Sequence, residues 1–114
     1  MNFANSLRAL KTHAYYYQFG KIHFSVDDVE TRLSPSAIVL LSQLIYWQGK
    51  ESEPEKGVYK TRDEWEDELG MSSKRVDTAR SELIKAGLMS EYKEQFPVKI
   101  YYKLNVDTLE SYLS

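Results

Sequence analysis

Hydrophobic residues recur at helical spacing through residues 73–86, between two signals that mark the ends of a helix. One stripe, with steps of three and four residues, consists of Val76, Ala79, Leu83 and Ala86. This pattern predicts a helix that buries one face and leaves a polar, partly basic face outside. Ser72 or Ser73 can cap the start of this helix, and Gly87 can end it.

Two further helices have equally clear starts. The serine–proline pair Ser34-Pro35 marks the start of a helix, and residues 37–47 are apolar on nearly every side, so they predict a central buried helix. Thr61 and Glu64 have the spacing of a capping box, which predicts a helix that Gly70 ends. Short helices are also expected over residues 106–113 and over residues 26–33, where Ser25 and Asp28 resemble a second capping box.

Alternating apolar and polar residues predict strands after Gly87. Residues 88–93 and 98–105 read as two strands around a turn that contains Pro97, and residues 58–60 read as a short third strand. The order strand, helix, turn, helix and hairpin predicts an α+β fold, mostly helical. This is the order of a winged helix-turn-helix with extra helices at the N- and C-termini.

A separate apolar stripe begins the chain. It consists of Phe3, Leu7, Leu10 and Ala14. The stripe either packs onto the chain's own domain or forms a contact between two copies, because its spacing also suits a partner helix. We therefore divide the chain into an arm over residues 1–21 and a domain over residues 22–114, and we expect a homodimer.

Composition narrows the possible classes of protein. The 114 residues suffice for one compact domain, and the absence of cysteine excludes disulfides and thiolate metal sites. The sequence has no apolar run of membrane-spanning length and no secretory signal, so a cytoplasmic protein is expected. The net charge is −2, but residues 51–70 hold three basic and eight acidic side chains, whereas residues 71–104 hold seven basic and four acidic ones.

The local basic excess coincides with the helix over residues 73–86 and the hairpin after it, which favours an anionic partner. Lys, Ser and Thr side chains on such a helix can reach phosphates or base edges in a major groove. We expect lysine and arginine to neutralise phosphates, and Thr78 and Ser81 to contact bases. The candidate DNA-binding residues are Ser72, Ser73, Lys74, Arg75, Thr78, Ser81, Lys85, Lys99 and Lys103. The alternative for the helix alone is a solvated surface.

Several local sequences together resemble one set of proteins. These are residues 41–47, 58–61, 64–65, 68–72, 79–80, 83, 87–88 and 101–105, within a span of roughly residues 22–113. They resemble winged-helix proteins of phages, plasmids and integrated elements, including the DNA-binding domains of replication initiators and small regulators. The resemblance implies double-stranded DNA binding in replication initiation or transcription regulation. It places the second helix of the motif in the major groove and the hairpin along the backbone or minor groove. The strongly acidic first helix departs from the pattern.

The sequence gives little support for a catalytic function. There is no glycine-rich phosphate loop and no metal-ligand spacing, so we expect no enzyme, no cofactor and no small-molecule substrate. The acidic cluster over residues 63–68 is explained by the preference of carboxylates for the start of a helix. The alternative function is a protein-interaction module or DNA mimic that uses the acidic surface of residues 51–70.

Overall fold

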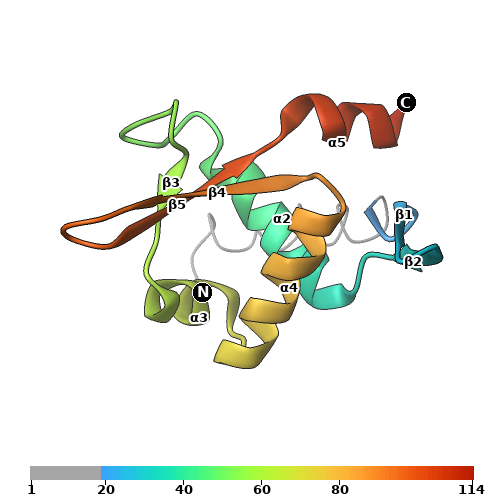
Figure 1. Cartoon of the computed structure of the whole chain (residues 1–114), viewed down its shortest axis with the longest axis horizontal. Helices are drawn as coiled ribbons and strands as arrows, with labels where there is room; N and C mark the ends of the chain where they lie inside the picture. Colours follow the sequence, from blue (N-terminus) through green and yellow to red (C-terminus); the bar gives the residue numbers. More distant parts are fainter. Residues whose placement is uncertain (1–18) are drawn as a thin grey trace, which may run out of the picture.

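The computed structural model describes residues 19–114, which form four helices and two small antiparallel sheets (Figure 1). In chain order the elements are β1 His23–Val26, β2 Val29–Arg32, α2 Pro35–Trp47, β3 Val58–Tyr59, α3 Arg62–Leu69, α4 Ser73–Lys85, β4 Met89–Glu94, β5 Lys99–Leu104 and α5 Val106–Leu113. The structure is therefore an α+β domain, as the sequence predicts. Within this range, none of the helices combines the length and the apolar character that crossing a membrane requires.

Helix α2 is the centre of the core. Its predicted start is confirmed, because the Ser34 hydroxyl accepts a hydrogen bond from the backbone N–H of Ala37, and Pro35 occupies the first turn. The Glu82 carboxylate of α4 accepts hydrogen bonds from the backbone N–H and the hydroxyl of Ser34. This carboxylate places a negative charge at the N-terminus of α2, where the helix dipole favours it, and joins α2 to α4.

The larger sheet has the strand order β3-β5-β4. Strand β5 pairs with β4 from Met89–Leu104 to Glu94–Lys99, and with β3 through Val58–Tyr102. The predicted hairpin and its short third strand are therefore confirmed. In Figure 1 the hairpin projects beyond the body of the domain, next to α3 and α4.

Helices α3 and α4 have the caps that the sequence predicts. The Thr61 hydroxyl accepts from the Glu64 N–H, and the Glu64 carboxylate accepts from the Thr61 N–H, which lowers the pKa of that carboxyl. Gly70 ends α3 with a φ of 65°, a left-handed conformation that suits glycine. Only Met71 and Ser72 separate this glycine from α4, so a short turn connects the two helices.

The helix predicted over residues 26–33 is wrong, because this segment is half of a β-hairpin. Asp27 and Asp28 adopt φ values of 51° and 65°, which is the geometry of a two-residue hairpin turn. Ser25 consequently pairs with Glu30 across the hairpin and caps no helix. Aspartate is suited both to the first turn of a helix and to a hairpin turn, so the spacing from Ser25 to Asp28 led to the wrong prediction.

The expected arm is only partly within the described residues. Phe3, Leu7, Leu10 and Ala14 lie outside them, and so does the predicted dimer contact. Phe19 is within them and packs in the core with residues of α2 and α4.

A partly buried ion pair joins the residue after β3 to α3 and, through hydrogen bonds, to α2. Lys60, which follows β3, is 9% exposed, and its ammonium lies 2.5 Å from a carboxylate oxygen of Glu68 on α3. The other Glu68 oxygen accepts from the Gln43 amide at 2.9 Å and from the Trp47 indole at 3.1 Å, both on α2. The same ammonium lies 3.9 Å from the Trp47 ring centroid. This network fixes α3 against α2.

We predict that Glu68→Ala lowers the free energy of unfolding by about 3 kcal/mol, because it leaves the Lys60 ammonium buried without its partner. Urea unfolding of the two proteins measures this difference. Asp67→Ala removes an exposed carboxylate from the adjacent position and is expected to change stability by less than about 0.5 kcal/mol. Equal stability of the two variants would contradict the role assigned to Glu68.

Candidate nucleic-acid interface

Helix α4 exposes one long face that no other element of residues 19–114 covers. Val76, Ala79 and Leu83 are buried against the core, so the residues half a turn away from them face solvent. An open depression along this face is lined by Ser73, Lys74, Asp77, Thr78, Ser81, Glu82 and Lys85. Five of the candidate residues therefore share one surface. Ser72 and Arg75 are also exposed, at the N-terminal end of α4.

The hydroxyl groups on this face differ in what they already contact. The Thr78 hydroxyl donates to the Lys74 carbonyl oxygen at 3.0 Å, which leaves its lone pairs and its methyl group for other contacts. The Ser72 hydroxyl accepts from the Arg75 N–H at 3.4 Å as the N-cap. In contrast, the Ser81 hydroxyl forms no hydrogen bond with any part of residues 19–114, so both its donor and its acceptors are available.

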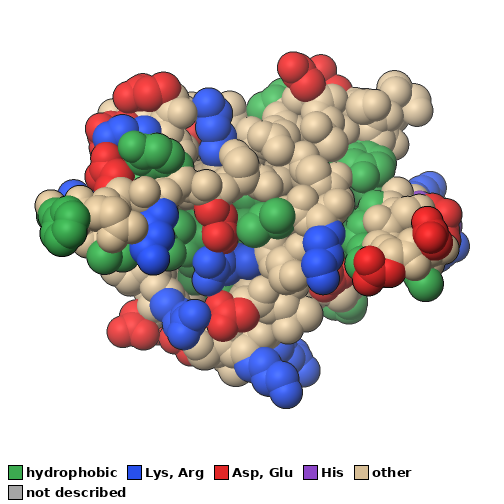
Figure 2. Space-filling model, viewed as in Figure 1, with side chains coloured by type: hydrophobic (Ala, Val, Ile, Leu, Met, Phe, Trp, Pro, Cys, Tyr) green, Lys and Arg blue, Asp and Glu red, His purple; other side chains and the backbone are tan. Residues whose placement is uncertain are grey.

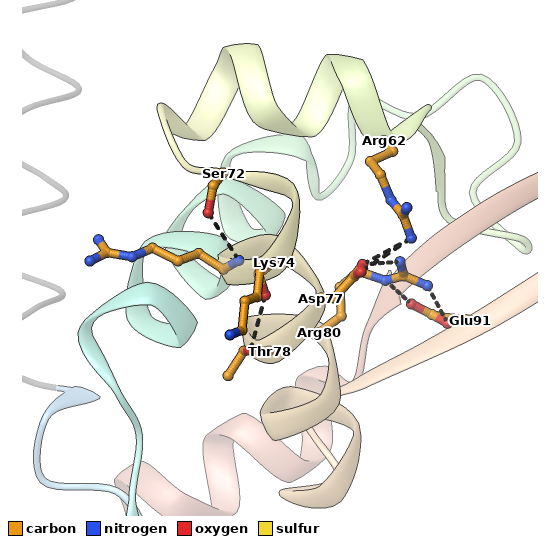
Figure 3. A network of polar contacts seen from close by, with 8 residues as sticks. Arg62, Ser72, Lys74, Asp77, Thr78, Arg80 and Glu91 are labelled. Carbon is orange, nitrogen blue, oxygen red and sulfur yellow. Dashed lines mark hydrogen bonds and ion pairs between the residues drawn. The ribbon is translucent and has the colours of Figure 1, made fainter.

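A chain of ion pairs borders the α4 face. Asp77 lies between Arg62 of α3, at 3.2 Å, and Arg80 of α4, at 3.1 Å. Arg80 also donates two hydrogen bonds to Glu91 of β4, at 2.7 and 3.1 Å. Figure 3 shows these four residues meeting between α3, α4 and the hairpin, whereas Lys74 points away from them.

The two arginines of this chain differ in accessibility. The Arg80 side chain is 19% exposed and lies over the Tyr102 ring, and its paired hydrogen bonds to Glu91 raise the pKa of the guanidinium. Arg62 is 56% exposed and contacts Asp77 alone among the acids of the described chain. Arg80 is therefore part of the scaffold that holds the hairpin to α4, whereas Arg62 retains donors that point to solvent.

The two faces of the hairpin have different neighbours. Directly paired residues of an antiparallel sheet point to the same face. Lys93 pairs with Ile100, two residues away from the Glu91–Tyr102 pair, so these side chains point to the same face of the hairpin. Because Glu91 contacts Arg80 of α4, this is the face on the side of α3 and α4, and Lys93 lies on it. Lys103 pairs with Ser90 and Lys99 with Glu94, so both face the opposite side together with Tyr101. Lys93 thus extends the α4 surface, and the sequence analysis did not select it.

The loop before β3 covers the opposite face of the hairpin. Glu53 accepts from the Tyr101 hydroxyl at 2.9 Å, which lowers the pKa of the Glu53 carboxyl and, together with burial, raises the pKa of Tyr101 to about 12. Lys103 donates to the Glu55 carbonyl oxygen at 3.2 Å, and the Lys99 ammonium lies 5.4 Å from the Tyr59 ring centroid. The structure therefore does not bring Lys99 and Lys103 to the surface that Lys74 and Ser81 share.

Basic side chains gather on the face that Figure 2 presents, over α4 and the neighbouring part of the hairpin, with acidic side chains between them. The basic residues that border this surface are Arg62, Lys74, Arg75, Arg80, Lys85 and Lys93. Its acids are Asp77, Glu82 and Glu91. The surface thus holds six basic against three acidic side chains, so its net charge is positive.

Arg62 and Lys93 are the interface candidates that sequence reasoning missed. Arg62 belongs to an acidic segment, and only the fold places it beside α4. For Lys93, the alternation in the hairpin was clear, but it does not say which face turns toward α4. In the described part of the chain, no three His, Asp or Glu side chains lie close enough together to hold a metal ion.

We predict that Glu91→Gln weakens the attachment of the hairpin to α4. The variant keeps the shape of the side chain but loses the charge that pairs with Arg80. It is expected to lower the free energy of unfolding by about 1–2 kcal/mol and to speed amide exchange in β4. The control is Asp77→Asn, which removes a carboxylate that is 44% exposed, so its pairs with Arg62 and Arg80 together contribute less than about 1 kcal/mol. A larger loss of stability in the control would contradict this assignment.

Comparisons with known proteins leave the interface without a homologous counterpart. No protein-family model, curated protein or solved structure matches the chain.

Proposed function

We propose that this chain is a winged helix-turn-helix domain that binds double-stranded DNA in a sequence-specific manner. In this proposal α3 and α4 are the helix-turn-helix, α4 enters the major groove, and the β4–β5 hairpin is the wing. The biological setting would be a phage, plasmid or integrated element, in replication initiation or in transcription regulation.

The observation that carries the proposal is the solvent-facing side of α4. A helix of 13 residues, capped at its N-terminus, presents Lys74, Thr78, Ser81 and Lys85 along a face that nothing in residues 19–114 covers. A helix is narrow enough to enter a major groove, and short polar side chains allow its backbone to approach the bases. The hairpin beside it supplies a second, basic contact through Lys93.

The roles of the side chains follow from their chemistry. The free backbone N–H groups at the start of α4, next to Ser72 and Ser73, suit a phosphate. Lys74, Arg75 and Lys85 suit phosphates as well, because flexible cations neutralise charge without fixed geometry. Ser81, whose hydroxyl forms no hydrogen bond within residues 19–114, is the best placed residue to read a base edge. Thr78 offers its methyl group and its lone pairs.

The acidic surface of residues 51–70 supports a function as a DNA mimic less well than the exposed face of α4 supports DNA binding. Of the eight acids in residues 51–70, Glu53, Glu64 and Glu68 are held by internal partners. A DNA mimic needs a regular row of unpaired carboxylates at the spacing of phosphates. The acids without such partners divide between the loop before β3 and the outer side of α3, which gives no single row.

Selection of bound fragments from random duplex DNA tests the proposal. The selected fragments are expected to share a short sequence, and a heparin column is expected to retain the protein and release it at moderate salt. Fragments without a common sequence, together with flow-through on heparin, would contradict DNA binding and favour a protein partner.

We predict that Lys74→Ala and Ser81→Ala weaken binding in different ways. Lys74→Ala removes a phosphate contact, so it should lower affinity for all sequences and reduce the salt slope by about 1. Ser81→Ala should change the preference at one base pair by about 1–3 kcal/mol and leave the salt slope unchanged. Titration of selected and scrambled duplexes across a salt series measures both. Unchanged affinity for both folded variants would mean that α4 is not the reader.

We also predict that the two faces of the hairpin are not equivalent. Lys93→Ala should lower DNA affinity and reduce the salt slope by about 1, because Lys93 lies on the side of α4. Lys103→Ala removes the same charge from the opposite face and should leave affinity within about twofold, since the screened interaction at that distance is weak. The same salt series measures both variants, and a larger effect for Lys103→Ala would reverse the proposed orientation.

Asp77→Asn is expected to strengthen DNA binding. The substitution removes a negative charge from the centre of the α4 surface and releases Arg62 for a phosphate. Affinity should therefore rise several-fold for all sequences, and the salt slope should become steeper by about 1. Arg62→Ala in the Asp77→Asn background should remove this gain. A fall in affinity after Asp77→Asn alone would indicate that Asp77 itself contacts a base.

A further inference from the structure

The tip of the β4–β5 hairpin is apolar and projects from the protein. Phe96 is 97% exposed, the highest value among the large hydrophobic side chains of residues 19–114, and Val98 beside it is exposed as well. Figure 2 shows the hydrophobic side chains at the projecting end of the hairpin. A fully exposed phenylalanine contributes almost nothing to the stability of its own domain.

Phe96 lies in the turn of the hairpin, directly before Pro97. Phe96 has a φ of 56°, in the left-handed region, where hairpin turns usually have glycine or asparagine. Phe96 therefore does not pack in the core, and its backbone conformation is one that large side chains rarely adopt. An apolar side chain at such a position is suited to a contact outside the domain.

Charged groups around the tip fit a polyanion. Lys93 and Lys99 lie three residues before and three residues after Phe96, and their pairing places them on opposite faces of the hairpin. The nearest carboxylate along the chain, Glu94, is neutralised by Lys56 at 2.6 Å. The tip is thus an aromatic side chain between two lysines that face in opposite directions.

The length of the hairpin fits the spacing of DNA grooves. Strand β4 follows α4 closely and extends for six residues, so at about 3.4 Å per step it reaches roughly 17 Å. Half a turn of duplex DNA, which separates a major groove from the next minor groove, is also roughly 17 Å. With α4 in the major groove, the tip reaches the neighbouring minor groove, and the two lysines face its two phosphate backbones.

We propose that Phe96 is a wedge that inserts between base pairs from the minor groove and bends the DNA. This inference rests on the proposed DNA-binding function and adds a mechanism to it. Apolar wedges unstack a base step at a free-energy cost and gain contact with the bent duplex. Pyrimidine–purine steps deform most easily, so the wedge would favour a site with such a step under the tip.

The test compares Phe96→Ala with Val29→Ala on a duplex selected by the wild-type protein and labelled at both ends with a pair of dyes. Val29 is the matched control, because it is 62% exposed on the other hairpin. Phe96→Ala should weaken binding about tenfold and abolish the change in energy transfer that reports bending, with an unchanged salt slope because no charge is lost. Val29→Ala should leave both unchanged.

Three outcomes would overturn the inference, and they are distinguishable. If Phe96→Ala binds and bends the duplex like the wild type while Lys74→Ala loses affinity, the wedge is wrong but DNA binding stands. If the wild-type protein binds no duplex, the proposed function fails and the wedge fails with it. If Phe96→Ala lowers the sedimenting mass and leaves bending intact, the tip is a contact between copies of the chain.

Discussion

The ion pair between the buried Lys60 side chain and Glu68 is the constraint on which the arrangement of the domain depends. An ammonium group that is 9% exposed needs its partner charge and the Trp47 ring, and these groups come from the helices on either side of β3. Such a pair adds little net stability compared with apolar packing, but it allows only one relative position of its elements. Because Gly70 and a short turn connect α3 directly to α4, fixing α3 also fixes the helix that carries the proposed interface.

Much of this fold was predictable because its signals are local. The serine–proline start at Ser34, the capping box at Thr61 and the glycine after α3 each act within one turn of chain, so the sequence alone defines them. The segment over residues 26–33 shows the limit of such signals. There Asp27 and Asp28 suit a helix start and a hairpin turn about equally, and the pairing of Ser25 with Glu30 is what selects the hairpin.

The candidate site was less predictable, because it depends on which side of each element faces which neighbour. The apolar stripe of α4 was enough to place Lys74 and Ser81 outside. In the hairpin, however, Tyr101 and Tyr102 are both buried, so both faces are covered and alternation alone does not say which is next to α4. The count of charged residues in the sequence was also a poor guide to the charge of the surface. Glu68 counts as unpaired acidic surface in the sequence, but its carboxylate is paired with the Lys60 ammonium.

The most direct test of DNA binding through α4 is to map the contact surface by nuclear magnetic resonance. The isotope-labelled protein would be titrated with the duplex that it selects, and the amide shifts would be compared residue by residue. The account predicts the largest shifts at the N-terminal half of α4 and at residues 93–99 of the hairpin, with small shifts in the β1–β2 hairpin. Shifts confined to the acidic side of α3, with α4 unchanged, would contradict it.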